Sequence, residues 1–227
     1  MSRLFAFGCS FTNYRWSTWA DCLAPEFDSF ENWGQSGGGN HYIFNSVMEA
    51  DQRHHFGAGD TVIVCWTSFT REDRYADGRW HTLGNMFTCP IYNTEYLKTH
   101  VDERGYLMRD LAFIKATKTL LESRLDLSWK FLSMVDAGTV NNAQDVTELY
   151  QDVIDLIAPS YYTVLFKGRW PDRASDPHPS PAEHLAYLDL VLPGWVTKES
   201  TRVIMQEESI DLNKDPRKSG MTKVTRL

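Results

Sequence analysis

Apolar residues along the chain change their spacing several times, as they do in proteins that alternate strands and helices. Short apolar runs predict five strands, at residues 4–7, 30–33, 61–66, 129–135 and 162–166. Windows with apolar residues at every third or fourth position predict helices at about 16–24, 40–55, 92–123, 144–157 and 181–192. The run at 61–66 is apolar on both faces, which is typical of a central parallel strand covered by helices. The pattern therefore predicts an α/β fold around a parallel five-stranded sheet.

The predicted elements divide the chain into one domain over residues 1–193 and a C-terminal extension over 194–227. A length of 227 residues suits a single domain with a modest extension. The pattern weakens after about Gly194, and the segment 214–227 holds five basic residues against one acid, Asp215. We expect this basic tail to lie over the surface, with contact to a partner as the alternative.

Charge and apolar content narrow the function classes. Lys and Arg number 23 against 30 Asp and Glu, which gives a net charge of -7 and disfavours nucleic acid and anionic membranes as partners. A small molecule or a glycan fits this charge better. No apolar run approaches the roughly 20 residues of a membrane-spanning helix, and the first residues resemble a strand rather than a signal peptide. We therefore expect neither a transmembrane helix nor a signal peptide.

In an open parallel sheet the ligand site lies at the carboxyl ends of the strands, so the residues that follow each predicted strand are the candidates. Ser10 follows the first strand after Gly8, and a serine projecting there can act as a nucleophile. After the second strand, Gly37 to Gly39 open a predicted helix. Glycines at a helix start favour either a phosphate cradle or an oxyanion hole. The Lys-Ser/Thr pair of a nucleotide-binding P-loop is absent.

A histidine lies at a fixed position late in the chain. Ser180 and Glu183 form a capping box with Pro181 at the first helical position, so a helix is predicted to begin there. His178 precedes this helix between two prolines, and Asp176 lies two residues before it. A histidine held beside a carboxylate has the position, tautomer and charge stabilisation that a general base requires. Nucleophile, anion site and base are thus predicted at one edge of one sheet.

Three segments resemble the SGNH (GDSL-like) hydrolase family: residues 7–12, 32–37 and 176–181. Residues 65–71 stand at the place of a further family block and depart from its pattern. The likeness spans about residues 3–192. It implies a flavodoxin-like three-layer α/β/α sandwich and a serine hydrolase that acts on esters, often acetyl or other acyl groups on sugars or lipids. The Cys-Ser-Phe-Thr and Trp-Thr-Ser-x-x-x-Arg segments resemble divergent members encoded by bacteriophages. This likeness implies a cytoplasmic or virion-associated protein.

Carried over to this chain, the resemblance makes Ser10 the nucleophile, His178 the base and Asp176 its orienting acid. It places the backbone N–H groups of Ser10 and Gly37 in the oxyanion hole. Ser68 stands where the family has an asparagine that donates to the oxyanion, and a serine hydroxyl is a shorter donor. Cys9 stands in place of the family's aspartate beside the nucleophile.

Two further residues are predicted to bind substrate. Asn40 ends the glycine-rich block, and Arg71 follows the third strand. Arg71 either holds an anionic group of the substrate or pairs with Asp73. Neither a metal nor another cofactor is expected.

Alternatives remain open at this stage. Cys9 is a second possible nucleophile, although strand alternation points it away from Ser10. Asp176, His178 and His184 together form a conceivable metal site, with packing inside the helix as the ordinary role of His184. At the level of function, the alternative is a non-catalytic binding or assembly protein, such as a phage structural component. Its contact surfaces would be the basic tail and the aromatic connection at 71–96. A metal-dependent phosphoesterase is a third reading, and the oligomeric state is undetermined.

Overall fold

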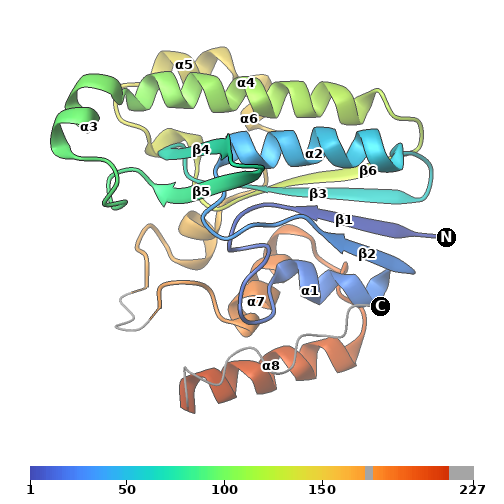
Figure 1. Ribbon diagram of the computed structural model, residues 1–227. Helices are drawn as coiled ribbons and strands as arrows, with labels where there is room; N and C mark the ends of the chain where they lie inside the picture. The colour runs from blue at the N-terminus through green and yellow to red at the C-terminus, as the bar shows by residue number, and fades with distance from the viewer. Residues whose placement is uncertain (172–175, 215–227) are drawn as a thin grey trace.

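A computed structural model describes residues 1–171 and 176–214 of the chain (Figure 1). In this part a parallel sheet has the order β2-β1-β3-β6, from β1 (Arg3–Phe7), β2 (Ser29–Asn32), β3 (Asp60–Trp66) and β6 (Ser128–Ser133). Four of the five predicted strands are therefore confirmed. The strand order is that of a flavodoxin-like sheet without its fifth strand. The predicted basic tail lies outside the described residues beyond Lys214.

The predicted fifth strand at 162–166 is wrong. This segment is a π-helical turn, Tyr161–Leu165, whose start is capped by Ser160 Oγ accepting from the N–H of Thr163 at 3.2 Å. Tyr161 is fully buried against Tyr187, with ring centroids 3.5 Å apart. In place of a fifth strand, Ala158 lies beside the outer edge of β6, where its N–H donates to the carbonyl of Phe131 at 2.9 Å. A serine cap and a burial site for Tyr161 outweigh the apolar pattern that favoured a strand.

Helices cover both faces of the sheet, which confirms the three-layer α/β/α arrangement (Figure 1). One face is covered by α2 (Asn40–His54), α4 (Glu103–Glu122), α5 (Gln144–Leu149) and α6 (Gln151–Ile154). The other is covered by α1 (Trp19–Leu23) and α7 (Pro181–Val191), with α8 (Glu199–Lys214) outside them. Short 3-10 turns occur at Ala24–Glu26 and Ala137–Thr139. No helix among the described residues is long and apolar enough to cross a membrane.

Alternate residues of the central strands supply two separate cores. Phe5 and Val62 lie in the core between the sheet and helices α2 and α4. Leu4 and Ile63 lie in the core between the opposite face of the sheet and helices α1 and α7. All four side chains are at most 1% exposed. Both faces of the sheet are therefore buried, as the sequence of the third strand predicted.

The aromatic connection at 71–96 contains a β-hairpin that the apolar pattern did not predict. Strands β4 (Arg71–Ala76) and β5 (Arg79–Asn85) are antiparallel, and α3 (Thr94–His100) follows them. Asp77 and Gly78 join the strands with φ angles of 51° and 74°. Two positive φ angles match a type I′ turn, for which Asp-Gly is a preferred sequence. The dipeptide was thus the available signal for this hairpin.

The C-terminal extension contributes one helix to the packed structure. Helix α8 contacts α7 and α1. Ser209 Oγ accepts from the N–H of Ala182 at 2.7 Å, and Met205 is fully buried. The weakening pattern after Gly194 did not predict this helix, because its apolar side chains are few. The division of the chain at residue 193 stays a prediction.

Asp73 of the hairpin caps the N-terminus of α2. Its Oδ1 accepts from the N–H of Gly39 at 2.8 Å, and its Oδ2 accepts from the N–H of Tyr42 at 2.9 Å. A Cβ on Gly39 would lie 2.7 Å from Asp73 Oδ2, so only glycine permits this approach. The protein's own carboxylate therefore occupies the place that the phosphate-cradle reading gave to a ligand.

We expect Asp73→Ala to lower the free energy of unfolding by about 1–3 kcal/mol, because two N–H groups of α2 lose a buried acceptor. Urea unfolding followed by circular dichroism measures this change. The exposed Asp152 provides a matched control, since Asp152→Ala should stay within about 0.5 kcal/mol of the parent protein. Equal stabilities for the two variants would contradict the capping role of Asp73.

Candidate active site

The turn after β1 places Ser10 at the carboxyl edge of the sheet. The carbonyl of Cys9 accepts from the N–H groups of Thr12 at 2.9 Å and Asn13 at 3.1 Å, which closes the turn. A Cβ on Gly8 would lie 2.0 Å from Thr12 Oγ1, so the chain can fold back this tightly only at glycine. Ser10 itself is 4% exposed.

Ser10, His178 and Asp176 form one chain of hydrogen bonds. Ser10 Oγ lies 2.8 Å from His178 Nε2, and His178 Nδ1 lies 2.6 Å from Asp176 Oδ1. Asp176 Oδ1 also accepts from the backbone N–H of His178 at 3.0 Å. The structure thus brings together the three residues that the sequence predicted as nucleophile, base and acid. With Nδ1 donating to the carboxylate, Nε2 is the nitrogen that accepts the serine proton.

The electrostatics of the site favour a neutral imidazole beside an ionised carboxylate. Burial lowers the pKa of His178 below its ordinary value, and the positive charges of Arg71 and Arg15 add to this effect while Asp176 opposes it. Burial alone would raise the pKa of Asp176, but hydrogen bonds from Tyr14 and His178 outweigh it and hold that pKa below its ordinary value. At neutral pH the pair is therefore in the protonation state of a general base and its partner.

The segment that carries His178 is fixed from both sides. Helix α7 begins at Pro181 with the predicted capping box, in which Glu183 Oε2 accepts from the N–H of Ser180 at 2.7 Å. Before it, the carbonyl of Pro179 accepts from Trp16 Nε1 at 2.7 Å. These contacts hold the loop of His178 against the loop of Ser10.

Of the three glycines that open the predicted helix, Gly38 and Gly39 use their N–H groups within the protein. The N–H of Gly38 donates to the carbonyl of Gln35 at 2.9 Å, and that of Gly39 donates to Asp73. The N–H of Gly37 has no hydrogen-bond partner among the described residues. Gly37 has a φ of 77°, and a Cβ there would lie 2.4 Å from the carbonyl oxygen of Thr82. The hairpin therefore fixes Gly37 in a conformation that suits glycine.

Ser68 and Arg71 follow β3 at the same edge. Ser68 Oγ lies 2.8 Å from Thr70 Oγ1, and one of these two hydroxyls donates a hydrogen bond to the other. Arg71 Nη1 donates to the carbonyl of Gly38 at 2.9 Å, and Nη2 lies 3.7 Å from the sulfur of Met134. Within the described part of the chain, Arg71 Nε is buried without a partner and Arg71 makes no ion pair with Asp73. The guanidinium of Arg71 therefore lies between the segment before α2 and the residue that follows β6, and its charge makes the electrostatic potential there more positive.

Asn40 has a different environment from the one predicted for it. The residue is fully buried, and its amide nitrogen donates to Asp110 Oδ2 at 2.8 Å while its amide oxygen accepts from the N–H of Thr67 at 2.9 Å. Burial raises the pKa of Asp110 to about 6, against the opposing effect of Arg109. Asn40 therefore ties α2 to α4 and to the end of β3, and we do not retain it as a substrate-binding residue.

Cys9 and His184 are also buried away from solvent. Cys9 has no exposed surface and lies in the core between the sheet and helices α1 and α7. His184 Nδ1 lies 2.8 Å from the hydroxyl of Tyr161, and burial lowers the pKa of His184 to about 3. In the described ranges no group of three or more His, Cys, Asp or Glu side chains is arranged to hold a metal ion.

Two residues of the site were missed in the sequence. The hydroxyl of Tyr14 donates to Asp176 Oδ2 at 2.6 Å, and Arg15 Nη2 donates to the same oxygen at 2.8 Å. Both lie in the run Asn13 to Trp16, directly after the serine turn. The signal available in the sequence for these two site residues was an aromatic residue followed by a basic one, between the end of the first predicted strand and the start of the first predicted helix.

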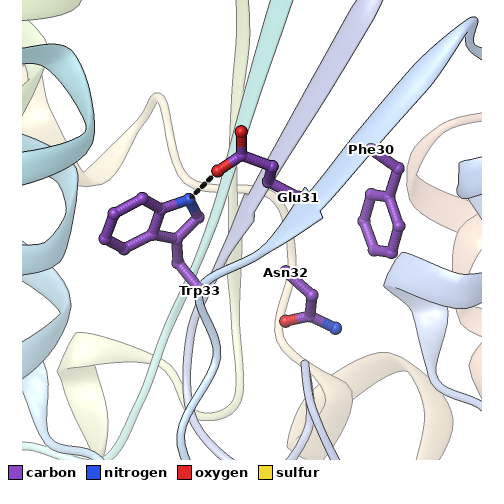
Figure 2. A pocket seen from close by; sticks show the side chains of 4 residues that line it. All are labelled: Phe30, Glu31, Asn32 and Trp33. Atoms are coloured by element: carbon purple, nitrogen blue, oxygen red, sulfur yellow. Dashed lines mark hydrogen bonds between the residues drawn. The ribbon is translucent and has the colours of Figure 1, made fainter. Parts of the chain in front are cut away.

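A shallow cavity of about 280 Å³ lies at the end of β2, lined by Phe30, Glu31, Asn32 and Trp33. Figure 2 shows Trp33 Nε1 donating to Glu31 Oε2, at 3.0 Å. Asn32 Nδ2 donates to the carbonyl of Thr12 at 2.8 Å, so this residue supports the serine turn. A second cavity, of about 340 Å³, lies between β4 and α4 beside Glu72 and Arg109.

The chain is similar to several solved structures. One is a member of the lipolytic protein G-D-S-L family from Veillonella parvula DSM 2008, with 13% identity, a TM-score of 0.48, and coverage of 85% of this chain and 98% of that one. Another is a catalytic mutant of an acetylxylan esterase from Geobacillus stearothermophilus, with 14% identity, a TM-score of 0.49, and coverage of 87% and 97%. A third is an alpha/beta hydrolase enzyme from the metagenome of Lake Arreo, with 13% identity, a TM-score of 0.48, and coverage of 87% and 97%. No family model and no curated protein matches the sequence.

Proposed function

We propose that the protein is a serine esterase of SGNH type that hydrolyses carboxylic esters through an acyl-enzyme. The observation that carries this proposal is the hydrogen-bonded chain from Ser10 Oγ through His178 to Asp176, at 2.8 Å and 2.6 Å. This is the arrangement that activates a serine hydroxyl toward a carbonyl carbon.

The reaction proceeds in two halves with one proton relay. Ser10 Oγ attacks the ester carbonyl while His178 Nε2 takes its proton, and Asp176 stabilises the imidazolium that forms. Collapse of the tetrahedral intermediate breaks the bond to the alcohol, which leaves with the proton from Nε2. A water molecule then attacks the acyl-enzyme, giving its proton to Nε2, and Ser10 recovers that proton as the acid is released.

The backbone N–H groups of Ser10 and Gly37 are the proposed donors to the developing oxyanion. Gly37 supports this role because the hairpin fixes it and its N–H has no partner among the described residues. The hydroxyl of Ser68 is the third candidate donor, since it can donate to the oxyanion while its oxygen accepts from the hydroxyl of Thr70. A single donor of this kind is worth about 3–4 kcal/mol of transition-state stabilisation.

We infer a small acyl group, such as acetyl, on a neutral alcohol such as a sugar. Ser10 is only 4% exposed, so little of its surface is open to a substrate. The net charge of -7 disfavours polyanionic substrates. Arg71 remains the candidate for holding a polar or anionic substituent of the substrate, because its guanidinium lies over the strand ends.

The pH dependence follows from the protonation state that His178 requires. Its pKa is lowered in the folded protein, so the neutral form that accepts the serine proton persists below pH 6.5, the ordinary value. We expect acylation of Ser10 to stay fast into mildly acidic solution and to fall only as pH drops through the lowered pKa of His178. Rates of covalent labelling between pH 4.5 and 8 measure this midpoint, and a midpoint above 7 would contradict it.

Covalent labelling tests the proposed function directly. The purified protein is treated with a fluorophosphonate, which reacts with activated serines, and mass spectrometry locates the adduct. We expect one adduct, on Ser10, together with hydrolysis of p-nitrophenyl acetate. The absence of both in a folded protein would overturn the esterase proposal.

A non-catalytic binding or assembly protein is the second candidate. It is favoured by one feature, the serine at position 68 in place of the family's asparagine, with a hydroxyl that is bonded to Thr70. A folded protein whose Ser10 resists the fluorophosphonate would fit this candidate.

A further inference from the structure

A single side chain in the loop of Ser10 contacts both of the other residues of the triad. The Tyr14 ring lies parallel to the imidazole of His178, with centroids 4.1 Å apart and an interplanar angle of 18°. Its hydroxyl donates to Asp176 Oδ2 at 2.6 Å, while Asp176 Oδ1 accepts from His178. Tyr14 thus closes a ring of contacts with Asp176 and His178.

We propose that Tyr14 is a positioning residue for the triad, whose ring sets the plane of the His178 imidazole and whose hydroxyl fixes the carboxylate of Asp176. This inference deepens the proposed function and rests on it for its catalytic meaning. Tyr14 lies four residues after Ser10, so the same turn that presents the nucleophile also presents the group that aligns its base.

The surroundings of Tyr14 fix its ring. Trp16 packs edge-on against it, with centroids 4.6 Å apart and an angle of 81°, and Trp16 Nε1 donates to the carbonyl of Pro179. Trp16 is 5% exposed. Trp16 belongs to the same loop as Tyr14 and donates a hydrogen bond to the loop of His178. It therefore fixes the position of the two loops relative to each other.

Arg15 also reaches Asp176 but holds it less firmly. Its side chain is 44% exposed, and an ion pair that open to solvent is worth little. The hydroxyl of Tyr14 lies closer to Asp176 Oδ2, at 2.6 Å against 2.8 Å for Arg15 Nη2. We therefore assign the positioning role to Tyr14 rather than to Arg15.

The proposal has a consequence for the proton affinity of His178. The charged and titratable groups that face this histidine are Asp176, Tyr14, Arg15, Arg71 and His184. By donating to Asp176, the hydroxyl of Tyr14 disperses the carboxylate charge that would otherwise stabilise the imidazolium. Tyr14→Phe keeps the stacked ring and removes only the hydroxyl, so the pKa of His178 should rise.

An NMR titration of the imidazole signals tests this step without requiring catalysis. The parent protein and Tyr14→Phe are titrated, with Tyr150→Phe as a matched control whose ring lies against the core below α4. We expect an upward shift of the His178 midpoint in Tyr14→Phe and no shift in Tyr150→Phe. An unchanged or lower midpoint in a folded Tyr14→Phe protein would overturn the role of the hydroxyl.

Tyr14→Leu removes the stacked ring as well. We expect its fluorophosphonate labelling rate to fall at least roughly tenfold below that of Tyr14→Phe at a pH where His178 is neutral in both, because the imidazole loses its alignment. Equal rates in the two variants would overturn the role of the ring. If the titration midpoint shifts as expected but the parent Ser10 is never labelled, the esterase proposal fails while the contact between Tyr14 and Asp176 is upheld.

Discussion

Ser10→Ala should reduce ester hydrolysis by at least about 10³-fold and abolish the fluorophosphonate adduct. The variant removes the only atom that can carry the acyl group in the proposed reaction, whereas the fold should persist because serine and alanine differ by one oxygen. Hydrolysis of p-nitrophenyl acetate measures the first effect, and mass spectrometry of the labelled protein measures the second. Unfolding curves establish that the variant is folded.

Cys9→Ala is the matched control for this experiment. Cys9 is fully buried in the core below α1 and α7, so its loss should lower stability by about 1–2 kcal/mol and leave Ser10 labelling in place. The opposite pattern, with activity lost in Cys9→Ala and kept in Ser10→Ala, would move the nucleophile to Cys9.

Asp176→Asn should lower the rate of ester hydrolysis by about 10³- to 10⁴-fold while leaving Ser10 in place. An amide at this position can donate to His178 Nδ1, which favours the tautomer whose Nε2 carries a proton and cannot accept one from serine. It also removes the negative charge that stabilises the imidazolium. Steady-state rates with p-nitrophenyl acetate measure the loss, and we expect it in kcat rather than in KM.

The exposed Asp152 supplies the comparison for Asp176. Asp152→Asn makes the same chemical change on α6 and should leave the rate within a factor of two. If Asp176→Asn retained the parent rate, His178 would not depend on this carboxylate, and a base oriented in another way would be needed.

The sequence predicted the elements whose signals are local. Strands β1 and β3 follow from short apolar runs, and α2 follows from a regular apolar spacing. The start of α7 follows from Ser180, Glu183 and Pro181, which form a capping box within one turn. Each of these signals is set by residues a few positions apart, so no knowledge of distant contacts was needed.

The errors in the predicted fold come from contacts between distant segments. Residues 162–166 have the composition of a strand, but Ser160 caps a helical turn there and Tyr161 packs on Tyr187 of α7. Helix α8 has few apolar residues, and its position depends on contacts with α7 such as that of Ser209 with Ala182. Neither outcome is encoded by the spacing of residues within the segment itself.

The predicted site also has a part that the sequence identified and a part that only the tertiary structure decided. Motifs and their order along the chain were enough to single out Ser10, Asp176 and His178, because a nucleophile, an acid and a base must be particular residue types. Only Ser10 follows a strand of the sheet, since the strand predicted before Asp176 and His178 is a π-helical turn. Only the tertiary structure decided that Asp73 occupies the glycine-rich helix start, that Asn40 is buried against Asp110, and that Tyr14 contacts Asp176. These three contacts join residues 34, 70 and 162 positions apart, and such distances are set by how the layers pack rather than by any local pattern.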